Sequence, residues 1–364
     1  MRITGKYEQL GAIKYFIPEA LPPQNPPFIM SAEIAALYGE AMLQLGKLNE
    51  MAHRLPNQQR FIKAYIIKEA LLSSSIEGIQ TTLIDVFTQH ILESKPNKNT
   101  QLVMNYTEAL YAALEMINQG LPVSSRIILN THYVLMNLGE GDKANPGNYR
   151  KQAVKVGNLV PPPTQYIPQL LSDLEYYINT DETLPPLIKA GLAHVQFETI
   201  HPFLDGNGRI GRLLIVLMLV DSNLLSKPIL YPSYYFKKHH LEYYHHLDKV
   251  RTDGDFENWI IFYLKAIKDS SIDAYQRAQE IESLWNDLTS NMTDEKKLRA
   301  LSVLFNFPII NISELAQQLH LSYNTANAII KDFLQQNIII EENQQKRGKL
   351  FKFAHYFTIL EKEY

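Results

Sequence analysis

Twelve residues near the middle of the chain hold side chains that could do chemistry together. The segment HPFLDGNGRIGR, residues 201–212, lies between two stretches with helical patterns. His201 titrates near neutrality and can take a proton from a nucleophile. Gly206 and Gly208 let the backbone approach a phosphate closely, and the amides that open the following helix attract anions.

Two arginines in the same segment indicate what kind of anion this is. Arg209 and Arg212 are three residues apart in the first turn of the expected helix, so they lie close together near its N-terminus. A cation is disfavoured there unless an anion binds between the arginines and the amides. The segment therefore predicts a polyphosphate site, and Asp205 beside it is a typical ligand for Mg²⁺. The Gly-Lys-Ser/Thr ending of a Walker A loop is missing.

The segment resembles the signature of the Fic family, His-x-Phe-x-(Asp/Glu)-Gly-Asn-Gly-Arg-x-x-Arg, at every fixed position. Members of this family typically transfer AMP from ATP to a Tyr, Ser or Thr hydroxyl of a target protein. The resemblance covers roughly residues 30–270. It implies that His201 is the general base, that Asp205 holds Mg²⁺ and that Phe203 anchors the loop in the core.

Residue by residue, the resemblance also implies a set of groups that bind ATP. This set comprises Asp205, Gly206, Asn207, Gly208, Arg209 and Arg212, with the arginines neutralising the β and γ phosphates. Tyr243 and Tyr244 fall where the family commonly places an adenine-contacting tyrosine. The intact Gly-Asn-Gly favours AMP transfer over phosphoryl transfer, which a related branch of the family performs.

The segment SSSIEG, residues 73–78, ends a helical stretch with a carboxylate at the negative end of the helix dipole. It resembles the family pattern (Ser/Thr)-x-x-x-Glu-(Gly/Asn) of an inhibitory helix, here placed before the core. Ser73 and Glu77 share one helix face, and Gly78 can end the helix. The resemblance implies that Glu77 pairs with Arg212 in the γ-phosphate position. The same glutamate could instead position water for removing AMP.

Around these motifs the chain is expected to be mainly α-helical. Four regions are predicted: an N-terminal helical region (1–110), a catalytic core (111–270), a linking helix (271–292) and a C-terminal winged helix-turn-helix (293–364). Residues 1–30 are expected to be extended. The turn-rich segment at about 147–163 predicts a small β-hairpin, which resembles the flap that pairs with a target's backbone in Fic proteins.

The C-terminal region raises a second class of function, a transcription regulator. From Met292 onward it has nine Lys/Arg and eight Asp/Glu, a thin electrostatic footprint for DNA. The expected recognition helix carries only Lys331, and the wing carries Lys346, Arg347 and Lys349. Whether this region contacts DNA or a protein stays open, and so does a homodimer.

The composition is that of an ordinary globular protein. Apolar residues make up 46% of the 364, charged residues 20%, and the formal net charge is -3, so no strong basic field indicates nucleic acid. The absence of cysteine excludes disulfides and cysteine-bound zinc and fits a reducing compartment. No apolar run is long enough to span a bilayer. We therefore expect a cytoplasmic protein that uses ATP and Mg²⁺ and has no membrane partner.

Overall fold

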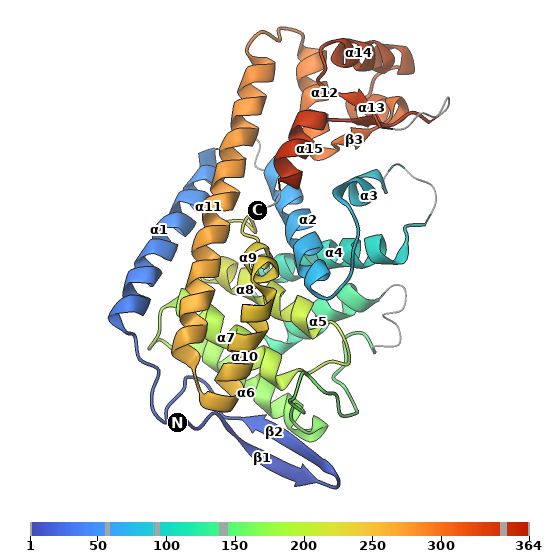
Figure 1. The fold of residues 1–364 in the computed structure, drawn as a ribbon. Coiled ribbons are helices and arrows are strands. Elements are labelled where there is room, and N and C mark those ends of the chain that lie inside the picture. The colour runs from blue at the N-terminus through green and yellow to red at the C-terminus, as the bar shows by residue number, and fades with distance from the viewer. Residues whose placement is uncertain are drawn as a thin grey trace.

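The computed structural model describes residues 2–54, 59–89, 91, 95–137, 145–342 and 348–362. Helices dominate it, which confirms the mainly α prediction (Figure 1). The helices before the C-terminal unit are α1 (Ala32–Arg54), α2 (Gln59–Ile76), α3 (Leu83–Thr88), α4 (Lys98–Asn118), α5 (Ser125–Met136), α6 (Ile167–Thr180), α7 (Pro186–Ile200), α8 (Asn207–Asp221), α9 (Ser233–Lys238), α10 (His240–Asp253) and α11 (Phe256–Thr289), with a 3-10 turn at Thr164–Tyr166.

The N-terminal residues form a β-hairpin that the sequence reading described only as extended. Strands β1 (Gly5–Leu10) and β2 (Ile13–Pro18) pair antiparallel around a two-residue turn, where Gly11 has a φ of +61°. A positive φ at this place favours glycine. The hairpin is held to the core from β2, because the amide of Phe16 donates to the carbonyl of Val160 at 2.9 Å.

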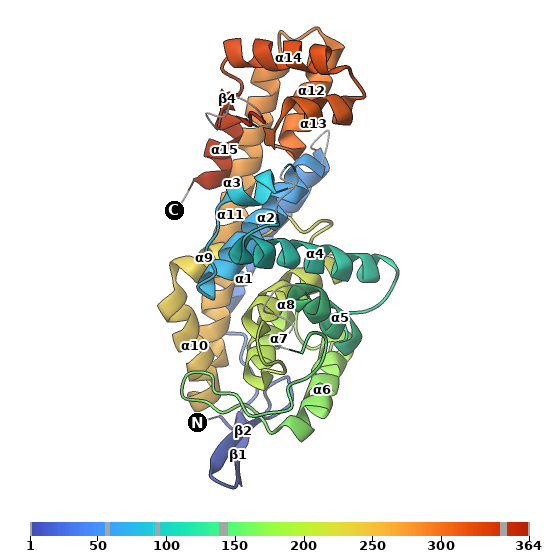
Figure 2. The same ribbon diagram turned by 90° about the vertical axis from the view of Figure 1, so that its right-hand side faces the viewer.

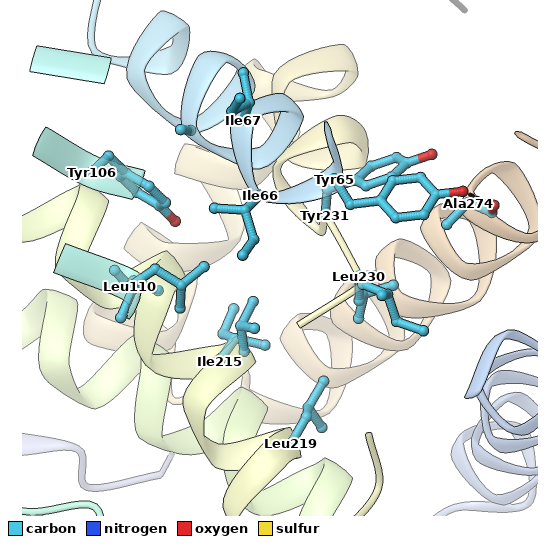
Figure 3. Packing of buried hydrophobic residues seen from close by; sticks show 14 of the residues in the cluster. Tyr65, Ile66, Ile67, Tyr106, Leu110, Ile215, Leu219, Leu230, Tyr231 and Ala274 are labelled. Atoms are coloured by element: carbon cyan, nitrogen blue, oxygen red, sulfur yellow. Dashed lines mark hydrogen bonds between the residues drawn. The ribbon is translucent and has the colours of Figure 1, made fainter. Parts of the chain in front are cut away.

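Helix α2 lies at the centre of the packing. Figure 3 shows its residues Tyr65, Ile66 and Ile67 beside Tyr106 and Leu110 of α4 and beside Ile215 and Leu219 of α8, all of them buried. Such a helix, apolar on several faces, is stable only when neighbours cover it. The position of α2 is therefore set in part by its packing against these two helices.

One long helix connects the core to the C-terminal unit. Helix α11 packs along α1 at its N-terminal end and continues to the C-terminal unit without a break (Figures 1 and 2). The predicted boundary at residue 270 falls inside this helix, where Ser270 and Ser271 are both buried. The predicted linking helix at 271–292 corresponds to the second half of α11, because the buried face of this helix runs on past residue 270.

The C-terminal unit contains the expected helix pair and the two strands around a polar turn. Its elements are α12 (Glu295–Asn306), β3 (Ile309–Ile310), α13 (Ile312–Leu319), α14 (Tyr323–Gln335), β4 (Ile340–Glu341), β5 (Phe351–Lys352) and α15 (Ala354–Glu361). The strands form an antiparallel sheet in the order β3-β5-β4. Of the expected wing cations, Lys346 and Arg347 lie outside the described residues, and Lys349 is paired with Glu341 at 2.6 Å.

The segment expected to be a hairpin at 147–163 is not a two-stranded ribbon. A tight turn at Gly157 brings Val156 and Leu159 into a single bridge with two hydrogen bonds of 2.8 and 2.9 Å. The alternation in the sequence did not lead to strands here, because the segment is held by side-chain contacts to the core that are described below. Within the described ranges, no helix has both the length and the apolar character needed to cross a membrane.

Replacing Arg2 tests how firmly the N-terminal segment is anchored. Both Nη atoms of Arg2 donate to the Glu257 carboxylate at 2.7 Å, and three backbone carbonyls accept from the same guanidinium. We expect Arg2→Met to lower the free energy of unfolding by about 2–4 kcal/mol, because a partly buried carboxylate loses its partner. Thermal unfolding followed by circular dichroism measures this, with the exposed Lys6→Met as control. Equal midpoints for the two variants would contradict it.

Candidate active site

The twelve-residue segment comprises a short loop, residues 201–206, and the start of helix α8. Helix α7 ends at Ile200, and its C-cap His201 takes a left-handed conformation with a φ of 49°. Helix α8 begins at Asn207 after Gly206, whose φ is 80°. A left-handed histidine is costly unless its surroundings hold it. The loop is therefore a fixed structure whose contacts can be traced.

Asn207 has a structural task in this loop. Its Oδ1 accepts from the amide of Phe203 and its Nδ2 donates to the carbonyl of Phe203, both at 2.9 Å. Both polar ends of the amide are thus used by the backbone, which closes the loop on itself. The predicted role of the Asn207 side chain as a phosphate ligand is not supported by this geometry. Phe203 itself is fully buried, as expected for an anchor.

His132 of α5 supports the loop from the other side and was not identified from the sequence. Its ring stacks on Phe203 with centroids 3.7 Å apart. Its Nδ1 accepts from the amide of Gly147 at 3.0 Å, so its Nε2 carries the proton and donates to the carbonyl of Asp205 at 3.1 Å. Burial lowers the pKa of His132 to about 4, so the ring is neutral near pH 7.

Arg150 holds the backbone of His201 and was also not identified from the sequence. This buried guanidinium donates to the carbonyls of His201 at 2.8 Å and Pro162 at 2.7 Å, while its own amide donates to the carbonyl of Pro202 at 2.9 Å. A single residue thus joins the 147–163 segment to the loop. Burial lowers the pKa of Arg150 to about 10, and the acceptors of these bonds are neutral carbonyls.

His201 is suited to accept a proton. Burial, together with the positive charges of Arg251 and Arg150, lowers its pKa to about 4. The ring is therefore unprotonated at neutral pH, which is the form a general base needs. Glu198, three residues before His201, is buried as well, and burial raises the pKa of that carboxyl to about 7. Glu198 was not identified from the sequence, although it is the acidic residue of α7.

The N-terminus of α8 offers uncapped amides beside two arginines. No side chain caps this helix, so its first amides are free to meet an anion. Arg209 is buried, yet its Nε and Nη1 have no hydrogen-bond partner among the described residues. Its Nη2 lies 3.5 Å from Asp205 Oδ1. A buried cation with unused donors is costly, and a phosphate would satisfy it.

Arg212 is paired with Glu77, as the resemblance implied. Its Nη2 donates to Glu77 Oε1 at 2.7 Å and to the carbonyl of Ser73 at 3.0 Å, and its Nε donates to Ser73 Oγ at 2.9 Å. Burial acts to lower the pKa of Arg212, but the carboxylate of Glu77 raises it above its ordinary value. The predicted contact between Glu77 and Arg212 is thus confirmed.

Glu77 is held at the end of α2 by the backbone. The amide of Gly78 donates to the carbonyl of Ser75 and the amide of Ile79 to that of Ser74, each at 3.1 Å. This is a Schellman motif, and Gly78 supplies the positive φ it needs, +77°. The carboxylate approaches α8 so closely that a Cβ at Gly208 would collide with Glu77 Oε1.

Asp205 is placed where a metal ligand is expected. Its side chain is 68% exposed and lies beside Arg209. The described residues contain no cluster of three His, Asp or Glu that could hold a metal by itself. Mg²⁺ commonly binds through one carboxylate, several waters and phosphate oxygens. One exposed carboxylate next to a phosphate site fits that pattern.

The two tyrosines proposed for adenine differ in the structure. Tyr243 is buried, and its hydroxyl donates to Nε2 of His194 at 2.8 Å. His194 in turn donates from Nδ1 to the carbonyl of Gly211 at 2.8 Å. Tyr243 is therefore part of the core, and its proposed contact with adenine is wrong, because ring and hydroxyl are already used. Tyr244 is 45% exposed and remains a candidate.

Comparison with known proteins gives the same picture. Residues 35–115 match the Fic/DOC family N-terminal domain and residues 122–219 match the Fic/DOC family domain. A protein adenylyltransferase Fic from Drosophila grimshawi is 31% identical over 211 residues, which are 56% of this chain and 41% of that protein. The relative from Drosophila erecta is also 31% identical, and 40% of it is covered. The chain thus spans about two fifths of these curated relatives.

The fold is also similar to that of solved structures of Fic proteins. A Fic family protein from Desulfovibrio desulfuricans G20 superposes with a TM-score of 0.58 at 22% identity, covering 90% of this chain and 98% of that one. A Fic-1 fragment from C. elegans superposes with a TM-score of 0.53 at 21% identity, covering 69% and 74%. At these identities the likeness concerns the fold alone.

Arg150→Met tests the contacts that hold His201. We expect the variant to lower the free energy of unfolding by about 2–4 kcal/mol, because buried carbonyls lose their donor. Trypsin should also cleave faster after Lys155, since the 147–163 segment loses its tether. Lys151→Met, at the exposed neighbouring position, is the control. Unchanged cleavage and stability in Arg150→Met would show that Arg150 does not hold the segment.

Proposed function

Because the chain carries both Fic/DOC domains, we propose that it transfers AMP from ATP to hydroxyl side chains of target proteins and of itself. The observation that supports this most directly is the buried guanidinium of Arg209, which has unused donors beside the uncapped start of α8. Asn207 and Phe203 keep this anion site at a fixed place relative to His201. The named relatives from Drosophila are protein adenylyltransferases.

In this proposal His201 takes the proton of the attacking hydroxyl. The oxygen bonds to the α-phosphorus, the bond from that phosphorus to the bridging oxygen breaks, and pyrophosphate leaves. Arg209 and the α8 amides bind the charge that develops on the leaving group. Asp205 would hold Mg²⁺, which supplies further positive charge next to the phosphates. Neutral His201 is present at physiological pH because burial lowers its pKa to about 4.

We further propose that the pair of Glu77 and Arg212 keeps this activity low. Arg212 would bind the γ-phosphate of ATP, but Glu77 and Ser73 already use its donors. The two anions compete for one buried cation, so ATP binds in an unproductive position while Glu77 stays in place. The glutamate side chain is 35% exposed, so ATP can reach it from solvent.

Target binding would use the 147–163 segment. Arg150 of this segment donates to the carbonyl of His201 and so keeps the segment beside it. The C-terminal unit has the element order of a winged helix, and we propose that it binds a partner. The exposed α14 carries few cations and Lys349 is already paired, which favours a protein over DNA. Electrophoretic mobility of the full chain with duplex DNA at low and moderate salt separates these two partners.

Glu77→Gly is expected to raise AMP incorporation by roughly ten- to hundredfold, because a charge-assisted competitor worth about 1.5–3 kcal/mol is removed. ATP labelled at the α-phosphate and mass spectrometry of the protein measure this. The double variant with His201→Ala should incorporate none. Lys47→Met, at an exposed position of α1, is the control and should behave as the wild type.

Each other outcome points to a different reading. If Glu77→Gly is no more active than the wild type, the proposed inhibition is wrong. Added phosphate in place of AMP would assign the site to phosphoryl transfer. If the wild type removes AMP from modified protein and Glu77→Gly does not, Glu77 serves the reverse reaction.

A further inference from the structure

A cavity lies on the face of α2 that points away from Arg212. It has a volume of about 460 Å³ and is bounded by α2, residues 80–83, α9 and the end of α15. The residues of α2 that line it are Lys68, Leu71, Leu72 and Ser75. With 100° per residue these positions lie opposite Ser73 and Glu77. One helix therefore carries the inhibitory pair on one face and lines a cavity with the other.

The wall of this cavity has a cation, Lys68, whose charge is only partly compensated. Lys68 is buried, and its Nζ donates to the carbonyl of Leu360 at 3.3 Å. The nearest carboxylate, Asp273, is 4.0 Å away. That carboxylate is already used, because Arg277 binds it from Nε and Nη2 at 2.7 and 2.9 Å and Tyr231 donates to it at 2.6 Å. Lys68 and Arg277 thus share one carboxylate, so this group of three keeps a net positive charge when Lys68 is protonated.

The rest of the lining adds another cation and apolar side chains. Lys237 lines the cavity, and within the described residues no carboxylate lies within salt-bridge distance of it. Lys362 is neutralised by Glu280 at 2.8 Å, and Glu361 is the acid in the lining. Leucines of α2 and α15 supply an apolar wall. Burial, with Arg277 nearby, lowers the pKa of Lys68 to about 7, and a bound anion would favour its charged form.

The far wall of the cavity is fixed to the long helix. Arg277 of α11 donates to the carbonyls of Ile359 at 2.6 Å and Lys362 at 2.7 Å, so the end of α15 is anchored there. A molecule that contacts both walls therefore connects α2 to the end of α15, which α11 holds. Since the cavity exists while Glu77 is paired with Arg212, such a molecule favours that arrangement over one in which α2 has moved.

We propose that this cavity binds a small organic anion with an apolar body, and that its occupancy holds Glu77 on Arg212. The first half stands on the cavity and its charges. The second half rests on the proposed function, because it concerns the control of AMP transfer. The ligand would act as an inhibitor, and it would not enter the ATP site.

Binding is tested on the full chain with 1-naphthyl phosphate, which combines an apolar ring and a phosphate. Isothermal titration calorimetry should show one site in the wild type and in Lys47→Met, which removes an exposed lysine of α1. Lys237→Met should bind about tenfold more weakly, because a charged donor is lost. Uncharged 1-naphthol should bind more weakly than the phosphate to the wild type.

Three results would overturn the site. The probe does not bind the wild type, it binds Lys237→Met and Lys47→Met equally, or it loses affinity in Arg209→Gln but not in Lys237→Met. The last result would place it in the ATP site.

The regulatory half is tested by AMP incorporation from labelled ATP. The probe should lower incorporation in the wild type, and have little effect on Lys237→Met or on Glu77→Gly. Inhibition of Glu77→Gly to the same extent as the wild type, or no inhibition of the wild type despite binding, would overturn this half. If Glu77→Gly incorporates no AMP at all, the proposed function fails, whatever the calorimetry shows.

Discussion

The structure depends on a positive charge buried among helices at the start of α8. Arg212 is almost fully enclosed, and a guanidinium in that position needs anionic or polar partners to be tolerated. Ser73 and Glu77, more than a hundred residues earlier in the chain, provide them from the end of α2. Arg209, one turn earlier on α8, keeps unused donors. The site thus has one cation already satisfied from within the protein and one that awaits an anion.

The loop that presents these groups is held both by a contact within it and by residues from elsewhere in the chain. Asn207 closes it from within, while His132 and Arg150 hold it from α5 and from the 147–163 segment. The histidines around it are kept neutral by burial. A neutral, oriented His201 and a fixed anion site meet the main requirement of phosphoryl and nucleotidyl transfer, where positioning and electrostatics do most of the catalysis.

Helix α2 contacts both the helical core and the C-terminal unit. Its centre is buried among α4, α8 and α9, and its side toward α15 carries Lys68, which contacts the last turn of the chain (Figures 1 and 3). Glu69, on the face of Ser73 and Glu77, is a buried carboxyl whose pKa burial raises to about 7. Any change in how α15 or α9 packs therefore acts on the helix that carries Glu77.

The sequence by itself determined the helical class and predicted an anion site at residues 201–212, because both rest on short local patterns whose spacing fixes the geometry. The contact between Glu77 and Arg212, which lie 135 positions apart, was implied only by the resemblance to the Fic family. It did not indicate Arg150 or His132, whose contacts join residues 51 and 73 positions apart. It gave no sign that the side chains of Asn207 and Tyr243 are used inside the protein, since nothing in a local pattern tells whether the backbone of Phe203 or the ring of His194 will use their polar atoms first. Only tertiary structure decides this, because packing brings distant groups together and a polar atom buried by that packing binds whichever partner lies within reach.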